Sequence, residues 1–242
     1  MRANAILLLF MSAGLAAQAP EVCNPADLFG PYAFQLTGST DISGTPRPTV
    51  SLGRIAFGDR GSLSGTATAA FRGLLLGNPV TGSYQVNLDC SVIWKLQDDS
   101  GGFQNFSGTL STDGSTVQFR QTDPGGAHHG IMRKLSDTCS SADLDKKYQF
   151  TLAGATTPME PGDVARAVSA KGTLDIAENG SVQVESDCSV QFRLTLRAPD
   201  GRIAETPPLT MSGFLVAGGK EILAFQTDPG SIVAARFIAE PK

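Results

Sequence analysis

Apolar and polar residues alternate along short stretches of the chain, and this pattern predicts β-strands. Tyr32, Phe34 and Leu36 occupy every second position near the start, and small or polar residues lie between them. Similar segments follow along the chain, separated by turns rich in Gly, Pro, Asn and Asp, which is typical of antiparallel strands with one buried face. Because no amphipathic helix of useful length interrupts them, we expect an all-β protein.

One long motif occurs twice. Residues 82–96 and 180–194 share Gly-Ser-x-Gln-Val-x-x-Asp-Cys-Ser-Val, followed after one residue by an aromatic residue, a base and Leu. Upstream, Cys-x-x-Ala-Asp-Leu-x-x-x-Tyr-x-Phe-x-Leu-x-Gly begins at both Cys23 and Cys139, and Gln-Thr-Asp-Pro-Gly closes a predicted strand in each half. We therefore predict a tandem repeat, with homologous modules over residues 20–136 and 137–242.

The second module is shorter in its middle. Cys23 and Cys90 are 67 positions apart, whereas Cys139 and Cys188 are 49 apart, a difference of 18 residues. Two strands and a turn have about this length, so we interpret the difference as one missing hairpin. We expect about eight strands in the first module and six or seven in the second. Up-and-down barrels are favoured over sandwiches, because closure removes unpaired edges.

The N-terminus has the pattern of a secretory signal peptide over residues 1–19. Arg2 precedes an apolar run at residues 5–15, which ends in small residues and is too short to span a membrane. The formal net charge of −4 and the lack of a basic cluster argue against nucleic acid and anionic membranes as partners. We expect a secreted or periplasmic monomer without a cofactor and without membrane insertion after cleavage.

Four cysteines in an exported chain favour disulfides. The repeat selects Cys23–Cys90 and Cys139–Cys188 as the pairs, each within one module. The alternative pairs, Cys23–Cys188 and Cys90–Cys139, would require intertwined modules. A zinc site is disfavoured, because the cysteines are widely spaced.

Three motifs together resemble those of a group of exported bacterial proteins, common in soil bacteria, for which no activity is established. They are Gly-x-Tyr-x-Val-Asn-x-Asp-Cys-Ser at residues 82–91, the Gly-rich segment at residues 54–65, and residues 218–230 ending in Gln-Thr-Asp-Pro-Gly. The resemblance covers most of each module and implies an antiparallel barrel somewhat like those of lipocalins or allene oxide cyclase. It implies no catalytic residues.

Few residues suggest chemistry. His128 and His129 are the two histidines; adjacent residues on an extended chain point in opposite directions, and we expect both in a solvated loop without a metal. Asp98 and Asp99 suggest a cation site, but the matching positions of the second module, Leu196 and Arg197, do not. Further aspartates recur in both copies where turns need them to accept backbone hydrogen bonds: Asp89, Asp187, Asp123 and Asp228. No catalytic, cofactor or metal site is predicted.

Four aromatic side chains are candidates to line a ligand cavity, or else to fill the barrel: Phe57, Phe71, Tyr84 and Trp94. The main functional hypothesis is a non-enzymatic protein that binds a small apolar molecule or a partner in the cell envelope or outside the cell. The alternatives are a barrel enzyme of the cyclase or isomerase type and a structural or adhesive repeat.

Overall fold

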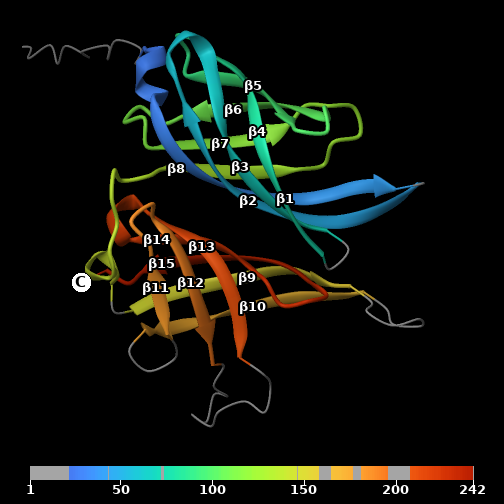
Figure 1. Cartoon of the computed structure of the whole chain (residues 1–242), viewed down its shortest axis with the longest axis vertical. Helices are drawn as coiled ribbons and strands as arrows, with labels where there is room; N and C mark the ends of the chain where they lie inside the picture. The colour runs from blue at the N-terminus through green and yellow to red at the C-terminus, as the bar shows by residue number, and fades with distance from the viewer. Residues whose placement is uncertain are drawn as a thin grey trace, which may run out of the picture.

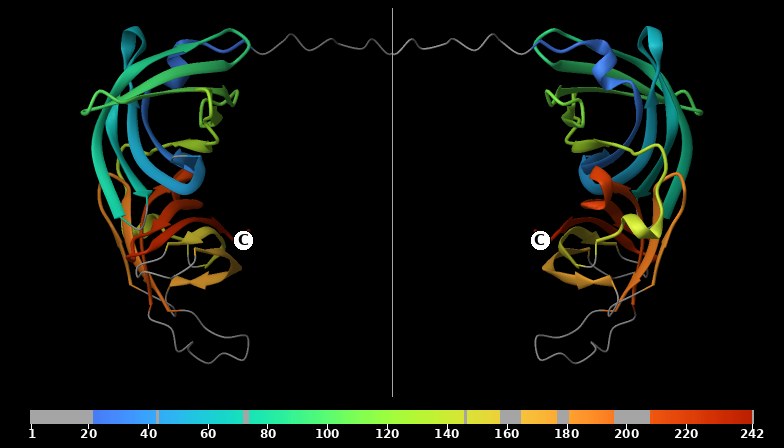
Figure 2. Two further views of the ribbon diagram at one scale, coloured as in Figure 1. Left: turned by 90° about the vertical axis from the view of Figure 1, so that its right-hand side faces the viewer. Right: turned by 90° about the vertical axis from the view of Figure 1, so that its left-hand side faces the viewer.

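The computed structural model describes residues 22–42, 44–71, 74–145, 147–157, 165–176, 181–195 and 208–241. These residues form two antiparallel β modules that lie one above the other along the long axis of the molecule (Figure 1). Views turned by 90° show the same arrangement (Figure 2). The predicted signal peptide at residues 1–19 lies outside the described residues.

The first module is a closed barrel in which eight strands follow one another in chain order and β8 pairs with β1. This confirms the predicted strand number and the choice of a barrel over a sandwich here. Its strands are β1 (Gly30–Ile42), β2 (Thr45–Phe57), β3 (Ser62–Phe71), β4 (Leu74–Val86), β5 (Ser91–Asp98), β6 (Phe103–Leu110), β7 (Thr116–Gln121) and β8 (His129–Lys134). A 3-10 turn, η2 (Asp59–Gly61), joins β2 to β3.

The second module is a seven-stranded antiparallel sheet in the order β10-β9-β15-β14-β13-β12-β11. Its strands are β9 (Lys147–Thr156), β10 (Arg166–Asp175), β11 (Val182–Val184), β12 (Ser189–Leu194), β13 (Leu209–Val216), β14 (Glu221–Gln226) and β15 (Ser231–Ala239). Among the described residues, no strand between β10 and β11 corresponds to β3, and β11 matches the last part of β4 alone. This is the region in which the sequence predicted a missing hairpin.

A short N-terminal turn covers one end of the first barrel. Asn24 caps η1 (Pro25–Leu28) and exchanges hydrogen bonds with Asp27 in a capping box, which satisfies backbone N–H groups that the short turn leaves free. The side chain of Leu28 is fully buried under this turn. The Cys23–Cys90 disulfide fixes the turn to the β4–β5 connection, so this end of the barrel is closed.

The second module repeats this closed end. Cys139 and Cys188 form its disulfide, so both cysteine pairs are those that the sequence predicts. The turn η3 (Ser141–Asp143) again has a capping box, between Ser140 and Asp143. The buried hydroxyl of Tyr148 donates to the carbonyl of Gly219 in η4 (Ala217–Gly219), as Tyr32 donates to Gly114 in the first module.

An apolar layer joins the modules. The outer face of β2 contributes Val50 and Leu52, and β14 and β15 contribute Leu223, Phe225 and Ile232, all buried in one cluster. Every residue of β14 is buried, because one face of this strand contacts the first module and the other faces the core of its own. A strand covered on both faces has continuous rather than alternating burial.

A buried carboxylate lies at the edge of this interface. The carboxylate of Glu221 forms an ion pair with Arg133, whose Nε lies 2.7 Å away, and accepts a hydrogen bond from Nε of Arg236 at 2.5 Å. Arg133 belongs to the first module and Arg236 to the second. Because Glu221 is itself buried, the two guanidinium groups compensate its charge where water cannot.

Candidate functional site

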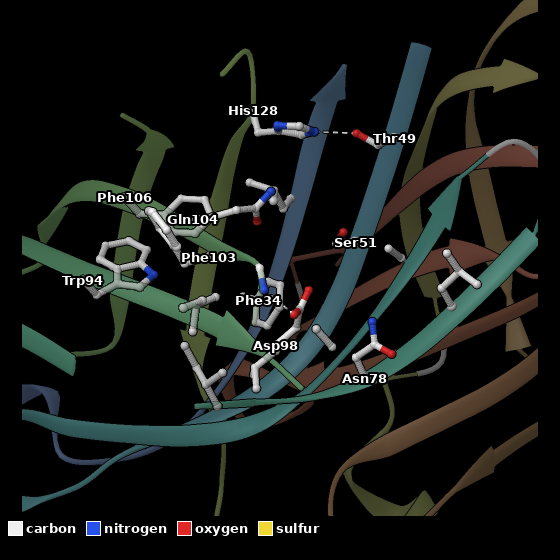
Figure 3. Close-up of a pocket in the computed structure, with 18 of the residues that line it drawn as sticks. Phe34, Thr49, Ser51, Asn78, Trp94, Asp98, Phe103, Gln104, Phe106 and His128 are labelled. Carbon is white, nitrogen blue, oxygen red and sulfur yellow. Dashed lines mark hydrogen bonds between the residues drawn. The ribbon is translucent and has the colours of Figure 1, made fainter. Parts of the chain in front are cut away.

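A cavity of about 420 Å³ lies in the first barrel, and Figure 3 shows residues that line it. Its lining reaches Thr40, near the end of β1 that is distant from η1. All eight strands contribute to its wall. Phe34, Ile55 and Trp94 are buried at its base, whereas Leu76 and Phe103 are about half exposed at its rim. The cavity is therefore a cup that is closed at its base by buried side chains and open at its rim.

Small side chains create this space. On β2 and β3, the inward positions that line the cavity include Ser51, Ala67 and Ala69. Another inward position on β2 is Gly53, where a Cβ atom would come within 2.5 Å of the Phe34 ring. The ring lies over the glycine as a result, so an aromatic side chain covers part of this wall.

Aromatic side chains form the base of the cavity on the other side. The rings of Trp94 and Phe106 are stacked with their centroids 5.4 Å apart, and Phe119 meets Trp94 edge to face at 5.0 Å. All three rings are buried. Such packed pairs hold one another in place, and they present a rigid apolar surface to anything in the cavity.

A buried histidine supplies a polar group to the wall. The ring of His128 is oriented by Oε1 of Gln121, 2.6 Å from its Nδ1, and by Oγ1 of Thr49, 2.5 Å from its Nε2. Residues His128 and Thr49 are 7% and 8% exposed. Burial lowers the pKa of His128 below its ordinary value, and the neighbouring His129 adds to this effect. The imidazole is therefore neutral at pH 7.

Asp98 places a carboxylate near the mouth of the cavity, at the end of β5. Its Oδ1 accepts from the backbone of Ser100 and Gly102 and from the Ser100 hydroxyl. The Ser100 hydroxyl is the main cause that lowers the pKa of Asp98. The side chain is thus fixed by the β5–β6 turn while it also lines the cavity (Figure 3).

The four aromatic residues singled out in the sequence divide into two pairs. Trp94 and Phe71 line the cavity. Phe57 and Tyr84 instead pack at the closed end, where their rings meet at 4.9 Å and Phe57 meets Tyr32 at 5.5 Å. The Tyr84 hydroxyl donates to the carbonyl of Gly58 at 2.7 Å, so this pair forms packed core.

The expectation of a solvated loop is wrong for His128, which is buried. His129 is exposed as expected, but it is the first residue of β8 and not part of the loop. The two rings lie on opposite sides of the chain, as adjacent extended residues do. The loop approaches β1 closely at Gly38, where a Cβ atom would lie 2.4 Å from the carbonyl oxygen of Ala127. In the sequence, Gly38 is the residue that could have indicated this close approach. A glycine alone does not show which segment approaches it until the positions of the strands are known.

The recurrent aspartates bind backbone and side-chain groups of their own turns or of the adjacent strand. Asp89 accepts from the backbone and hydroxyl of Ser91, and Asp187 accepts from the backbone of Ser189. Asp123 and Asp228 accept from backbone N–H groups 18 residues upstream, at 2.8 Å and 3.0 Å. These contacts match the structural role predicted for them.

Within the described residues, no group of three or more His, Cys, Asp or Glu side chains is placed to hold a metal ion. No described helix has the length and hydrophobicity needed to cross a bilayer. No protein-family model matches the chain, and no curated protein sequence matches it. The geometry of the cavity therefore carries the functional argument.

Proposed function

We propose that this is an exported, non-enzymatic protein whose first module binds a small, largely apolar molecule. One observation carries the proposal, namely the cavity of about 420 Å³ with its mainly apolar and aromatic lining. Small-molecule sites have volumes of roughly 300–1,000 Å³, with few polar groups in an apolar wall. A barrel whose interior served stability alone would be filled by its side chains.

Export is supported by the cysteines and by the leader pattern. Both disulfides lie within one module each, and disulfides persist mainly in oxidising compartments. The signal-peptide pattern of residues 1–19 supplies a route to such a compartment. The two observations together support a secreted or periplasmic location.

Descent of the two modules from one duplicated unit is supported by shared local geometry. Cys90 and Cys188 both adopt left-handed backbone conformations, with φ of 64° and 69°, which non-glycine residues seldom do. In each module a phenylalanine ring lies over a glycine of the paired strand. These pairs are Phe34 with Gly53 and Phe150 with Gly172.

The second module has a packed apolar interior and an apolar face against the first barrel, which suits a role in supporting that barrel. Phe192 and Phe237 meet edge to face at 5.2 Å inside its apolar cluster. Its β13 to β15 region also provides the surface against which the first barrel packs. We assign ligand binding to the first module and mechanical support of its β1–β3 wall to the second.

A second candidate function is a cyclase or isomerase reaction in the same cavity, and the buried neutral imidazole of His128 favours it. A neutral histidine is the side chain most often used as a general base. The two candidates differ in the fate of the ligand. A binding protein returns the bound molecule unchanged, whereas an enzyme converts it and loses conversion in His128→Asn.

The chain's single tryptophan, Trp94, lines the cavity and makes the binding test direct. Titration with N-phenyl-1-naphthylamine, a neutral fluorescent apolar molecule, is expected to quench Trp94 and to saturate at one molecule per chain. Ala67→Phe fills the cavity and is expected to abolish saturation. Ala56→Phe places the same side chain on the exposed outer face of β2 and is expected to preserve it. Equal binding by all three proteins would contradict the proposal.

A further inference from the structure

The hydrogen bonds of Gln121, His128 and Thr49 determine which atom of each contact donates and which accepts. Nε2 of Gln121 donates to Oδ2 of Asp123 at 3.0 Å, which turns the Gln121 carbonyl oxygen toward His128. Nδ1 of His128 must then carry the proton that this oxygen accepts at 2.6 Å. The neutral ring has one proton, so its Nε2 is an acceptor.

This assignment determines what Thr49 presents to the cavity. Since Nε2 of His128 is an acceptor, the hydroxyl proton of Thr49 is donated to it across 2.5 Å. A hydroxyl has one proton and two lone pairs. With the proton engaged, the oxygen of Thr49, a lining residue, has lone pairs alone to offer a ligand.

Like the oxygen of Thr49, the carboxylate of Asp98 accepts hydrogen bonds from a ligand, and it also carries a negative charge. An ionised carboxylate accepts hydrogen bonds and cannot donate them. The three hydrogen bonds from the turn all reach Oδ1. Among the described lining residues, Asp98 is the one with a full charge at neutral pH, and the lining includes neither Lys nor Arg.

Two basic side chains near the rim do not line the cavity. Lys95 is exposed on the outer face of β5, where its Nζ lies 4.1 Å from the centroid of the Phe103 ring. Arg47 is exposed on the β1–β2 hairpin, opposite Thr40. Because neither base lines the cavity, the carboxylate of Asp98 is the charge that a bound molecule meets there.

The side chains of Ser51, Asn78 and Gln104 also line the cavity and can donate as well as accept hydrogen bonds, so the charge of Asp98 decides the preference. From this charge we propose that the cavity selects apolar molecules that carry a cationic, hydrogen-bond-donating end group such as a primary ammonium, and discriminates against carboxylates. The apolar body lies against Trp94 and Phe106, and the end group lies at the carboxylate of Asp98, while Thr49 is a further acceptor elsewhere in the wall. This inference rests on the proposed binding function and names its ligand class. A cation close to aromatic faces gains additional attraction.

The test compares three molecules with the same eight-carbon body: n-octylamine, 1-octanol and sodium octanoate. Isothermal titration calorimetry of the full protein at pH 7 and low salt gives a Kd for each. The expected order is octylamine tightest, octanol intermediate and octanoate weakest, with about tenfold between the first and the last. Asp98→Asn is expected to bring octylamine to the affinity of octanol, because the neutral amide keeps an oxygen for the turn and removes the charge.

Two matched controls accompany this variant. Asp99→Asn removes the adjacent carboxylate, which is exposed and does not line the cavity, and Arg47→Gln removes the nearby base; both are expected to keep the order. Octanoate binding as tightly as octylamine, or a preference for octylamine that survives Asp98→Asn, would overturn the inference and leave cavity binding intact. Failure of all three molecules to bind, together with failure of N-phenyl-1-naphthylamine, would overturn the proposed function itself.

Discussion

The side-chain amide of Gln35 crosses from the first module to the second and donates to the carbonyl oxygen of Ala224 at 2.6 Å. The same nitrogen donates to the carbonyl oxygen of Ala235 at 2.9 Å. Gln35 is buried within the interface. One side chain thus joins the wall of the barrel to two adjacent strands of the other module, β14 and β15.

Replacing Gln35 by Met, which is similar in size, is expected to lower the free energy of unfolding by about 1–3 kcal/mol, because two buried carbonyl groups lose a donor. Gln35→Glu is expected to cost more at pH 7, since a carboxylate would face two carbonyl oxygens. Urea denaturation followed by circular dichroism gives both values. A Glu variant as stable as the wild type would show that the modules do not pack in this way.

The two disulfides are expected to stabilise the protein about equally. They close loops with sequence separations of 67 and 49 residues, and the restriction of the unfolded chain depends on the logarithm of loop length, giving about 4 kcal/mol for each. Denaturation of Cys23→Ala/Cys90→Ala and of Cys139→Ala/Cys188→Ala compares them. If one pair contributed several times more than the other, local packing rather than chain restriction would dominate.

Stability is expected to fall in two steps on acidification. The pKa of His128 is lowered in the folded state, chiefly by burial, so the unfolded chain takes up a proton first, and stability decreases as pH falls below about 6.5. The Ser111 and Ser115 hydrogen bonds lower the pKa of Asp113 to about 2. The stabilising contribution of Asp113 is present above about pH 4 and is lost as the pH falls from there to about 2.

Melting temperatures measured from pH 8 to pH 2 check this profile. His128→Asn is expected to remove the upper step and keep the lower one, while His129→Asn, at an exposed position, keeps both. An upper step that persists in His128→Asn would assign it to another group.

The lack of a counterpart to β3 among the described residues of the second module predicts unequal costs for equivalent substitutions. A Cβ atom at Gly53 would lie 2.5 Å from Phe34 and also 2.4 Å from the backbone oxygen of Thr66 in β3. The three atoms nearest to a Cβ atom at Gly172 all belong to the ring of Phe150, and the nearest lies at 2.8 Å. A ring can move aside, whereas a paired strand cannot, so Gly53→Ala should cost more than Gly172→Ala.

Overpacking of this kind costs roughly 1–3 kcal/mol, and we expect Gly172→Ala at the lower end and Gly53→Ala at or above the upper end. Chemical denaturation of the two variants, with Gly77→Ala at an uncrowded strand position as a control, measures the difference. Equal costs would contradict the assignment of β3 as the feature that distinguishes the modules.

Local alternation was sufficient to predict strands that bury a single face, because turns follow them closely. Val92 and Trp94 of β5 illustrate this, since both are buried while Ile93 between them is exposed; β14, buried on both faces, does not alternate. The disulfides were predicted because Cys23 and Cys139 occur in the same frame. Both inferences depend on neighbours in sequence, which the chain displays directly.

The polar part of the site depends on contacts distant in sequence. Thr49 and His128 are 79 residues apart, and nothing local distinguishes Thr49 from any exposed threonine of a strand. The histidine is buried because Gly38 lets its loop approach β1, which is a property of the closed barrel. Likewise, alternation marks Phe57, Tyr84 and Trp94 as inward, but distance from η1 determines which of them reach the cavity.

The most direct test of ligand binding by the first module follows the indole N–H signal of Trp94 by two-dimensional NMR during titration with n-octylamine. The account predicts that this signal shifts along a saturable one-site curve, together with the backbone signals of Thr49 and Asp98, while the signals of β9 to β15 remain in place. A titration that moves the second module's signals and leaves that of Trp94 unchanged would contradict it.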